Sequence, residues 1–151
     1  MQLKMTAPEL HAFLAEVFPQ LAGRFDIAEL APFRAGVRMT TTEADLRPGG
    51  TVSGPAMFTL ADCAFYIATL AMIGPEALTV TVNCCIDFLR KPAPGPLYAE
   101  ARILKLGRSL AVGDVLIRSA GIDGALSDPL ARASLTYSIP PRSTGSGPGS
   151  P

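Results

Sequence analysis

The feature that most constrains the fold is an uninterrupted apolar stretch in the middle of the chain. Residues 56–73 contain neither Gly nor Pro, Ser53 can cap a helix there, and Pro55 falls in its first turn. Gly74 and Pro75 then end it. At 1.5 Å per residue, a helix of roughly 18 residues is about 27 Å long, about the width of a small domain. Because apolar side chains occur all round it, the helix is predicted to be buried on all sides.

Asp62 is the one charged residue of this stretch. It lies too deep to cap the helix, and an ionised carboxylate there is costly unless it is hydrogen-bonded, paired or facing a cleft. Two interpretations are open: a structural one, with a hydrogen bond to Thr59 or Tyr66 or a chance exposed edge of the helix, and a functional carboxylate. The preceding loop favours the second, because its glycines and the free N–H groups of the helix start could bind an oxyanion beside a base or nucleophile.

Composition excludes several classes of function. The chain has 151 residues, 48% apolar and 17% charged, which suits one globular domain. Its 13 basic and 13 acidic residues balance, so no general attraction to nucleic acid or to an anionic membrane is expected. Asp62 near the centre of the apolar stretch argues against a membrane span. No signal peptide is expected, and the predicted location is the cytoplasm.

The cysteines do not have the spacing of a zinc site or a disulfide framework, and one histidine cannot form a multi-histidine metal site. Cys63 falls in the helix, Cys84 and Cys85 are adjacent, and free thiols in a reducing cytosol are predicted, with no metal and no cofactor. His11 is the only histidine and lies in the N-terminal segment. Hydrolytic chemistry, if present, is therefore expected to depend on a carboxylate.

Periodicity indicates the remaining elements. A first helix begins at residue 6 or 8 and runs to 21, with Pro19 interrupting its end; a connection follows over 23–32. Strands are predicted at 33–43, 79–89, 97–106 (with a bulge near Ile103), 110–120 and 130–139. In strand 79–89, Val82 and Cys84 face one way and Thr81 the other. This order predicts an α+β domain, a mostly antiparallel curved sheet wrapped around one long central helix. The sheet face away from the helix and the sheet edges are expected to meet a second subunit.

The chain is divided accordingly into three parts. These are an N-terminal helical segment at 1–32, the main domain at 33–139, and a tail at 140–151. The tail contains only Pro, Gly, Ser, Thr and Arg, so it is predicted to be disordered.

Three segments together resemble hot-dog fold acyl-CoA thioesterases of the phenylacetate-pathway (PaaI-type) group. The first is GGTVSGPAMFTLADCAFYIA, similar to the family signature G-x-x-H-G-G-x-x-x-x-L-x-D at the start of the hot-dog helix. The others are TVTVNCCIDFLRKPAPGPLYAEARILKLGRSLAVGDVLI and LARASLTYSI, similar to the long strand with its following hairpin and to the last strand. The resemblance covers about residues 33–139, in the family's order of elements.

The resemblance implies a function and a site. It implies hydrolysis of an acyl-CoA thioester by a homodimer or homotetramer, with CoA as part of the substrate. Gly54 matches the glycine whose N–H polarises the thioester carbonyl, and Asp62 matches the nucleophile or general base, acting on a substrate bound by the neighbouring subunit. Thr81 matches a position whose hydroxyl orients water or the carboxylate.

Further positions are implied to bind substrate. Arg90, Lys91, Arg108 and Ser109 lie at turns where family members contact the CoA arm, and Phe58 and Tyr66 could shape the acyl pocket. Arg47 and Ser53 also fall at substrate-positioning sites, but there the sequence departs from the family: Ser53 replaces a His, Pro55 a Gly, and Arg47 an Asn found in several members.

These departures keep a second hypothesis open, namely a hot-dog protein that binds an acyl-CoA or another apolar ligand and cleaves it slowly or not at all. A hydratase ranks third, because that chemistry in this fold usually uses a His with an Asp, and no histidine lies near the helix in the sequence.

Overall fold

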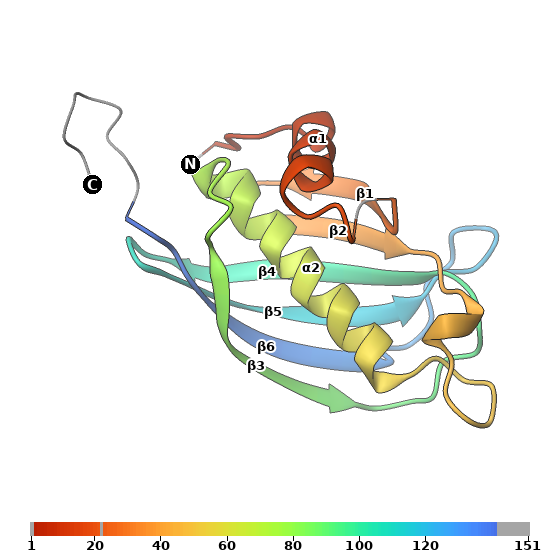
Figure 1. Cartoon of the computed structure of the whole chain (residues 1–151). Coiled ribbons are helices and arrows are strands. Elements are labelled where there is room, and N and C mark those ends of the chain that lie inside the picture. Colours follow the sequence, from red (N-terminus) through yellow and green to blue (C-terminus); the bar gives the residue numbers. More distant parts are fainter. Residues whose placement is uncertain (1, 22, 142–151) are drawn as a thin grey trace.

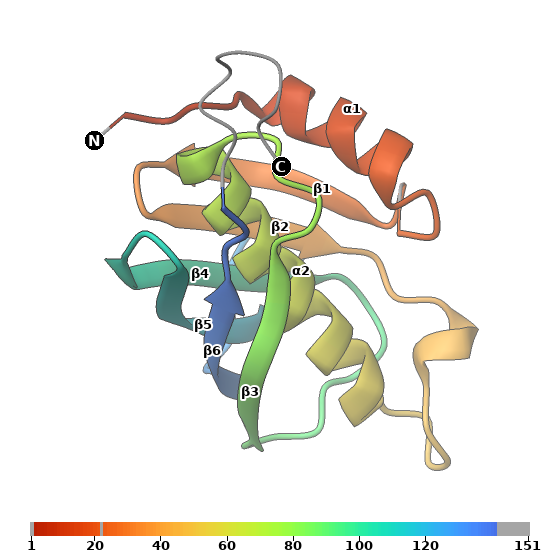
Figure 2. The same cartoon turned by 60° about the vertical axis from the view of Figure 1, so that its left-hand side comes forward.

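The computed structural model describes residues 2–21 and 23–141, so the predicted tail falls almost entirely outside the described residues. One long helix, α2 (Gly54–Ile73), lies across the concave face of a six-stranded sheet (Figures 1 and 2). The elements along the chain are α1 (Ala7–Val17), β1 (Phe25–Ala31), β2 (Arg34–Met39), a short 3-10 turn at Glu43–Asp45, α2, β3 (Val80–Phe88), β4 (Leu97–Leu106), β5 (Leu110–Ser119) and β6 (Ala131–Ser138).

All strand pairs are antiparallel, in the order β1-β2-β4-β5-β6-β3. This confirms the predicted α+β fold with a curved sheet around one helix. Burial alternates along β5 and β6: one face of each strand is buried, while the other is more exposed. The bulge expected in β4 is present, because its register against β5 shifts between Ile103 and Lys105.

Helix α2 follows its predicted limits. The Ser53 hydroxyl accepts a hydrogen bond from the Ala56 N–H (3.2 Å), and Gly74, with φ of 98°, ends the helix. By length and composition α2 could cross a membrane, but 83% of its most apolar window is buried inside the protein. It is therefore the core helix of this fold.

Three predictions of secondary structure were wrong. The strand predicted at 33–43 is shorter, because β2 ends at Met39 and Glu43 begins the 3-10 turn. The segment predicted to be a connection, 23–32, contains β1 at the edge of the sheet; a register shift between Ile27 and Glu29 breaks the alternation by which a strand is recognised. Helix α1 ends at Val17, short of residue 21, because Pro19 cannot continue the helix.

Close approach between α2 and the sheet depends on a glycine in β5. A Cβ built on Gly113 would collide with the backbone oxygen of Arg102 in β4 and with the ring of Phe65 in α2. The position therefore accepts no side chain without moving the helix or the neighbouring strand.

Candidate active site

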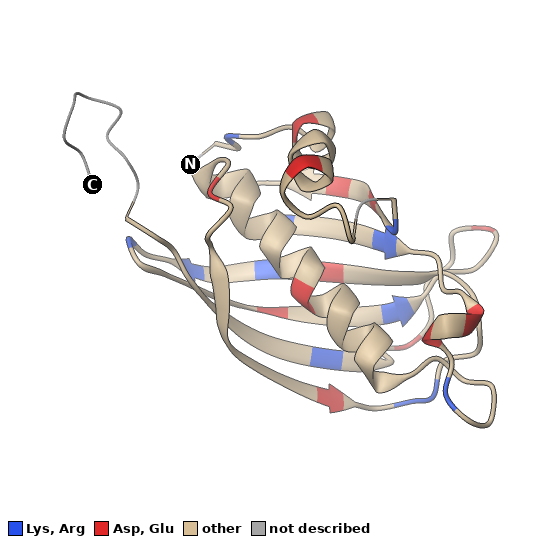
Figure 3. Ribbon diagram, in the orientation of Figure 1, with Lys and Arg blue, Asp and Glu red and all other residues tan. Residues whose placement is uncertain are grey.

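The composition of helix α2 predicted burial on all sides, and this prediction was wrong. Its N-terminal half has an open stripe made of Pro55, Phe58, Thr59 and Asp62, which are spaced i, i+3, i+4 and i+7 and so share one helical face. Figure 3 shows the single acidic band of α2 on this otherwise uncharged helix. The carboxylate thus escapes the full cost of burial, because it stands at the edge of a cavity.

Two hydroxyl groups hold one oxygen of this carboxylate. Asp62 Oδ1 accepts hydrogen bonds from Thr81 Oγ1 and from the Tyr137 hydroxyl, both at 2.6 Å. The Tyr137 oxygen also lies 2.7 Å from the backbone carbonyl of Asp62. Among the described residues, none donates a hydrogen bond to Oδ2. The carboxylate is therefore fixed through one oxygen while the other can act on a ligand. Thr59 donates instead to the Pro55 carbonyl, and Tyr66 to the Ala77 carbonyl, so neither expected structural partner bonds Asp62.

Thr81 reaches Asp62 because of a bulge that the sequence pattern did not indicate. The pairing of β3 with β6 shifts between Thr81 and Asn83, so Val82 is the extra residue. Simple alternation placed Thr81 on the face opposite Cys84, and this assignment was wrong. The bulge turns the Thr81 hydroxyl to the helix side, where the resemblance to the family required it.

Tyr137 was not recognised as a site residue. In the predicted strand 130–139 it alternates with the apolar residues Leu135 and Ile139, a pattern that indicates only a buried, inward-facing position. A buried tyrosine hydroxyl needs a partner, and the one carboxylate of the buried helix was the available acceptor, so this signal was present in the sequence. Burial, reinforced by the charge of Asp62, raises the pKa of Tyr137, so its hydroxyl remains a donor at neutral pH.

A cavity of about 520 Å³ opens beside Asp62. Its lining comes from α1 and the turn after it, from the open stripe of α2 and the residues beside it, from the start of β3 and from β6: Val17, Phe18, Leu21, Phe58, Thr59, Asp62, Cys63, Tyr66, Ala77, Thr79, Val80, Thr81 and Tyr137. Phe58 and Tyr66, expected to shape an acyl pocket, both belong to it. Its volume lies within the range of small-molecule pockets.

The cysteine thiols near the cavity are poor nucleophiles. Burial, with a further contribution from the Asp62 charge, raises the pKa of Cys63 to about 12. The same two causes, in the same order, raise the pKa of Cys84, with a smaller contribution from Cys85. Both thiols therefore stay protonated at neutral pH, and only a thiolate reacts well. All three cysteines are free, as predicted.

Gly54 opens a second cavity, of about 570 Å³, at the other end of the open stripe. The backbone N–H of Gly54 has no acceptor among the described residues, as expected for the first residue of a helix. The Phe88 ring lies against this glycine: a Cβ there would be 3.1 Å from its Cζ. Arg47, Arg90 and Lys91 also line this cavity and give it positive charge, though one guanidinium nitrogen of Arg90 donates to the Pro129 carbonyl.

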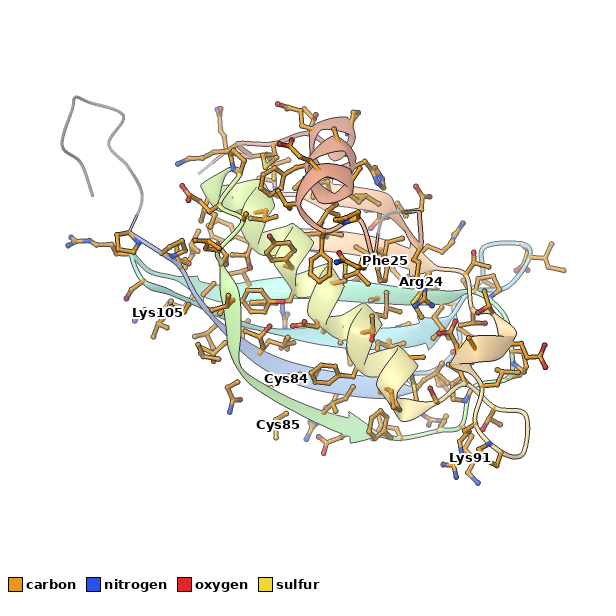
Figure 4. All side chains as sticks on the ribbon, viewed as in Figure 1. Arg24, Phe25, Cys84, Cys85, Lys91 and Lys105 are labelled. Carbon is orange, nitrogen blue, oxygen red and sulfur yellow. The ribbon has the colours of Figure 1, made fainter. Side chains whose placement is uncertain are left out.

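The loop that presents Gly54 is tied down by a partly buried ion pair. Arg24 Nη2 lies 2.9 Å and 2.8 Å from the two carboxylate oxygens of Asp45, and the backbone carbonyl of Asp45 accepts from the Ser53 N–H at 2.7 Å. Ser53 is thus a helix cap whose side-chain oxygen accepts from the Ala56 N–H. Figure 4 shows Arg24 beside Phe25, at the start of the strand β1.

Two predicted positions, and the only histidine of the chain, lie apart from both cavities. Arg108 and Ser109 line a groove with Lys105 in the β4–β5 hairpin, and Figure 4 shows Lys105 and Lys91 at opposite ends of the sheet. His11 accepts from the Ile27 N–H of β1, the edge strand opposite β3. In the described part of the chain, no three His, Cys, Asp or Glu side chains cluster closely enough to hold a metal ion.

The two candidate groups, the Gly54 N–H and the Asp62 carboxylate, lie well apart within one chain. Gly54 and Asp62 are eight residues apart on one helix, about 12 Å along its axis, whereas a base and an oxyanion donor must each approach the reacting group to about 3 Å.

Comparisons with known proteins agree with this description. The family model described as the thioesterase superfamily matches residues 49–125, about half of the chain and including Gly54, Asp62 and Thr81. A crystal structure of a candidate thioesterase from a Silicibacter species is 51% identical, with a TM-score of 0.83; the match covers 93% of this chain and 96% of that one. No curated protein matches.

Two further solved structures are more distant. The phenylacetic acid degradation protein PaaI of Thermus thermophilus, solved as a mutant, is 28% identical over 80% of this chain and 98% of that one, with a TM-score of 0.66. A Streptococcus mutans protein bound to acetyl-CoA shares the fold at 22% identity over 78% of this chain and 90% of that one, also with a TM-score of 0.66. The family match and the 51% identical structure together show that this chain belongs to the thioesterase superfamily and has its hot-dog fold.

Proposed function

We propose that this protein is a cytoplasmic homo-oligomer that hydrolyses acyl-CoA thioesters to a free acid and CoA. The observation that carries the proposal is the Asp62 carboxylate, which Thr81 and Tyr137 hold at Oδ1 and which opens to a cavity, while no described residue donates to its Oδ2. Membership of the thioesterase superfamily supports thioester hydrolysis in general. The chemistry needs no cofactor beyond the CoA that the substrate carries.

Asp62 has two possible roles in this reaction. Oδ2 can attack the carbonyl carbon, release the CoA thiolate and form an anhydride that water then hydrolyses. Alternatively, Oδ2 takes a proton from a water that attacks the same carbon directly. In both cases negative charge develops on the carbonyl oxygen, and the Gly54 N–H at the helix start would stabilise it, an effect of about 3 kcal/mol for a well-placed donor.

A shared site follows from the separation of Gly54 and Asp62. Strand β3 is an edge strand that begins beside the Asp62 cavity, with Val80 and Thr81, and ends beside the Gly54 cavity, with Phe88. If two copies pair through β3 about a twofold axis, the strands run antiparallel and the start of each lies opposite the end of the other. The Gly54 cavity of one protomer then adjoins the Asp62 cavity of its partner. A tetramer would pair two such dimers.

The basic residues around Gly54 suit the CoA end of the substrate. Arg47 and Lys91 are exposed at this cavity, and phosphate groups are attracted to such side chains. Arg108 and Ser109 could contact the same CoA only from another protomer, because they lie at the far end of the sheet. The acetyl-CoA bound to the Streptococcus mutans relative supports a CoA ester as the ligand class.

The test is CoA release from short, medium, long and aryl acyl-CoAs, followed by chromatography because exposed Cys85 would react with a thiol reagent. We expect Asp62→Asn to lose at least about a hundredfold in kcat/KM, or about 2.7 kcal/mol. The matched control is Asp114→Asn, a β5 carboxylate away from both cavities that pairs with Arg102 at the surface. A wild-type protein that cleaves no acyl-CoA, or an Asp62→Asn variant as active as wild type, would contradict the proposal.

The alternative is a protein that binds acyl-CoA without cleaving it. Its support is local: the Phe88 ring lies against the Gly54 position where the thioester oxygen would dock. Saturable binding of CoA esters, without CoA release and unchanged by Asp62→Asn, would favour this function over hydrolysis.

A further inference from the structure

The Asp62 cavity has a wall that comes from outside the helix and sheet of the core. Val17 and Phe18, at the C-terminal end of α1, line it together with Leu21. Val17 is 37% exposed and Phe18 is 40% exposed; Phe58, on α2, and Val80, on β3, are exposed to a similar or greater degree and line the same cavity. Exposed apolar side chains gathered around one concavity indicate an apolar ligand.

The charges of the two cavities indicate which end of the proposed substrate each cavity binds. None of the described residues that line the Asp62 cavity is basic, and Asp62 is its only charged side chain. A phosphate or a second carboxylate would be repelled there. The Gly54 cavity has Arg47, Arg90 and Lys91. The neutral, apolar end of a thioester therefore fits beside Asp62, and its anionic end fits beside Gly54.

The part of the cavity lining formed by Val17, Phe18 and Leu21, the α1 wall, is fixed in position before a ligand binds. Leu10 and Leu14 are buried in the core, and a capping box at Thr6 closes the start of the helix. After its end, the Leu21 N–H donates to the Phe18 carbonyl at 3.0 Å, and the Arg24 N–H donates to the Leu21 carbonyl at 3.2 Å. The Arg24 side chain is in turn bound to Asp45. The final turn of α1 is thus anchored on both sides while Phe18 itself faces the cavity.

We propose that the Val17–Phe18 end of α1 closes the acyl end of the cavity, so that it limits acyl length and selects neutral, apolar acyl groups. This rests on the proposed function and names its substrate class. Phe18 is the specificity residue: its ring occupies space that a longer chain would need. Because Phe18 is outside the buried core, its replacement changes the cavity with little cost to the fold.

The experiment compares kcat/KM for short, medium and long straight-chain acyl-CoAs in wild type, Phe18→Ala and Phe18→Trp. We expect Phe18→Ala to raise the long-to-short ratio about tenfold, the effect of one or a few methylenes in an apolar pocket, and Phe18→Trp to lower it. The control is Leu104→Ala, which removes a 61% exposed leucine that lines none of the described cavities. A ratio that neither Phe18 variant changes, in folded proteins, would overturn the proposal.

A second measurement separates this inference from the proposed function. Acyl-CoA thioethers, which cannot be hydrolysed, are titrated calorimetrically into the same variants. If wild type cleaves no acyl-CoA but Phe18→Ala still shifts thioether affinity toward longer chains, the proposed hydrolysis is wrong. The proposal that the α1 wall limits acyl length is then still supported. If affinity depends on chain length in the same way in all variants, the proposal that the α1 wall limits acyl length is wrong. A thioether with a terminal carboxylate should bind at least tenfold more weakly than its neutral counterpart, and equal binding would contradict the substrate class.

Discussion

Asp62 is the residue on which the site depends, and the two hydroxyls at Oδ1 decide how it is used. A hydrogen bond to a charged acceptor contributes about 1.5–3 kcal/mol. Removing either donor therefore lets the carboxylate rotate, and Oδ2 is then less well positioned to act as base or nucleophile. We expect Thr81→Val and Tyr137→Phe each to lower kcat by about 10- to 100-fold and to change KM little. Steady-state kinetics on the best acyl-CoA measure both parameters.

The control for the Thr81 variant is Thr136→Val, on the outward face of β6. It makes the same chemical change on the neighbouring strand without contact with Asp62, and it should retain full activity. Because Tyr137 is buried, thermal unfolding must show that Tyr137→Phe is folded at the assay temperature. Unchanged kcat in both variants would mean that the hydroxyls only support the fold.

At this scale the sequence supplied part of the site. Asp62 was recognisable because a lone carboxylate in an apolar helix needs a reason, and Gly54 because it begins that helix. The contact of Thr81 with Asp62 was not, since alternation placed its side chain on the wrong face and only the bulge at Val82 corrects this. Tyr137 was hidden in an inward-facing apolar pattern, where its hydroxyl is the only sign of another role.

At the scale of elements, the loop before α2 depends on the ion pair between Asp45 and Arg24. Burial alone would raise the pKa of Asp45, but the Thr42 N–H and the Arg24 guanidinium outweigh it and hold that pKa below its ordinary value of 3.8. A folded-state pKa below the unfolded one stabilises the fold above the unfolded pKa, and this stabilisation is lost as the pH falls through the folded pKa.

We therefore expect Asp45→Asn to lower the free energy of unfolding by about 1–3 kcal/mol near neutral pH, because it leaves Arg24 without its charged acceptor. The difference from wild type should shrink as the pH falls below about 4. Urea titrations at several pH values measure it. The control is Asp114→Asn, which removes an exposed partner of Arg102 and should cost little. A deficit that stays constant into acid would contradict the assignment.

Helices and strands were predicted correctly where capping residues or regular alternation mark them. Prediction failed where a bulge interrupts the alternation. The caps of α2, Ser53 and Gly74, fixed its limits, and the bulge of β4 was visible as a slip in alternation. Strand β1 was missed because its own bulge leaves no regular period, and because an edge strand needs only one partner, β2, to form. The cavities could not be predicted, since α1, α2 and β3 contribute to one of them from distant parts of the chain.

At the scale of the whole molecule, the proposed shared site combines Gly54 of one subunit with Asp62 of another. Mixing two variants, each of which lacks one of these groups, therefore tests the shared site directly. Gly54→Pro removes the proposed oxyanion donor, and the helix should tolerate it: proline suits the first turn, and Ser53 already has the extended backbone, φ −75° and ψ 157°, that precedes proline. Gly54→Ala keeps the N–H and is the steric control, because the Phe88 ring beside it is exposed and can move.

Gly54→Pro and Asp62→Asn should each be nearly inactive alone. When the two are unfolded together and refolded, each mixed dimer has one site that combines an intact Gly54 with an intact Asp62, so random pairing should restore about a quarter of wild-type activity. Sedimentation confirms that the refolded material is dimeric or larger, and refolding each variant alone supplies the baseline. If mixing restores nothing while both variants are folded and associated, the site lies within one chain, and the pairing through β3 that joins the two cavities is wrong.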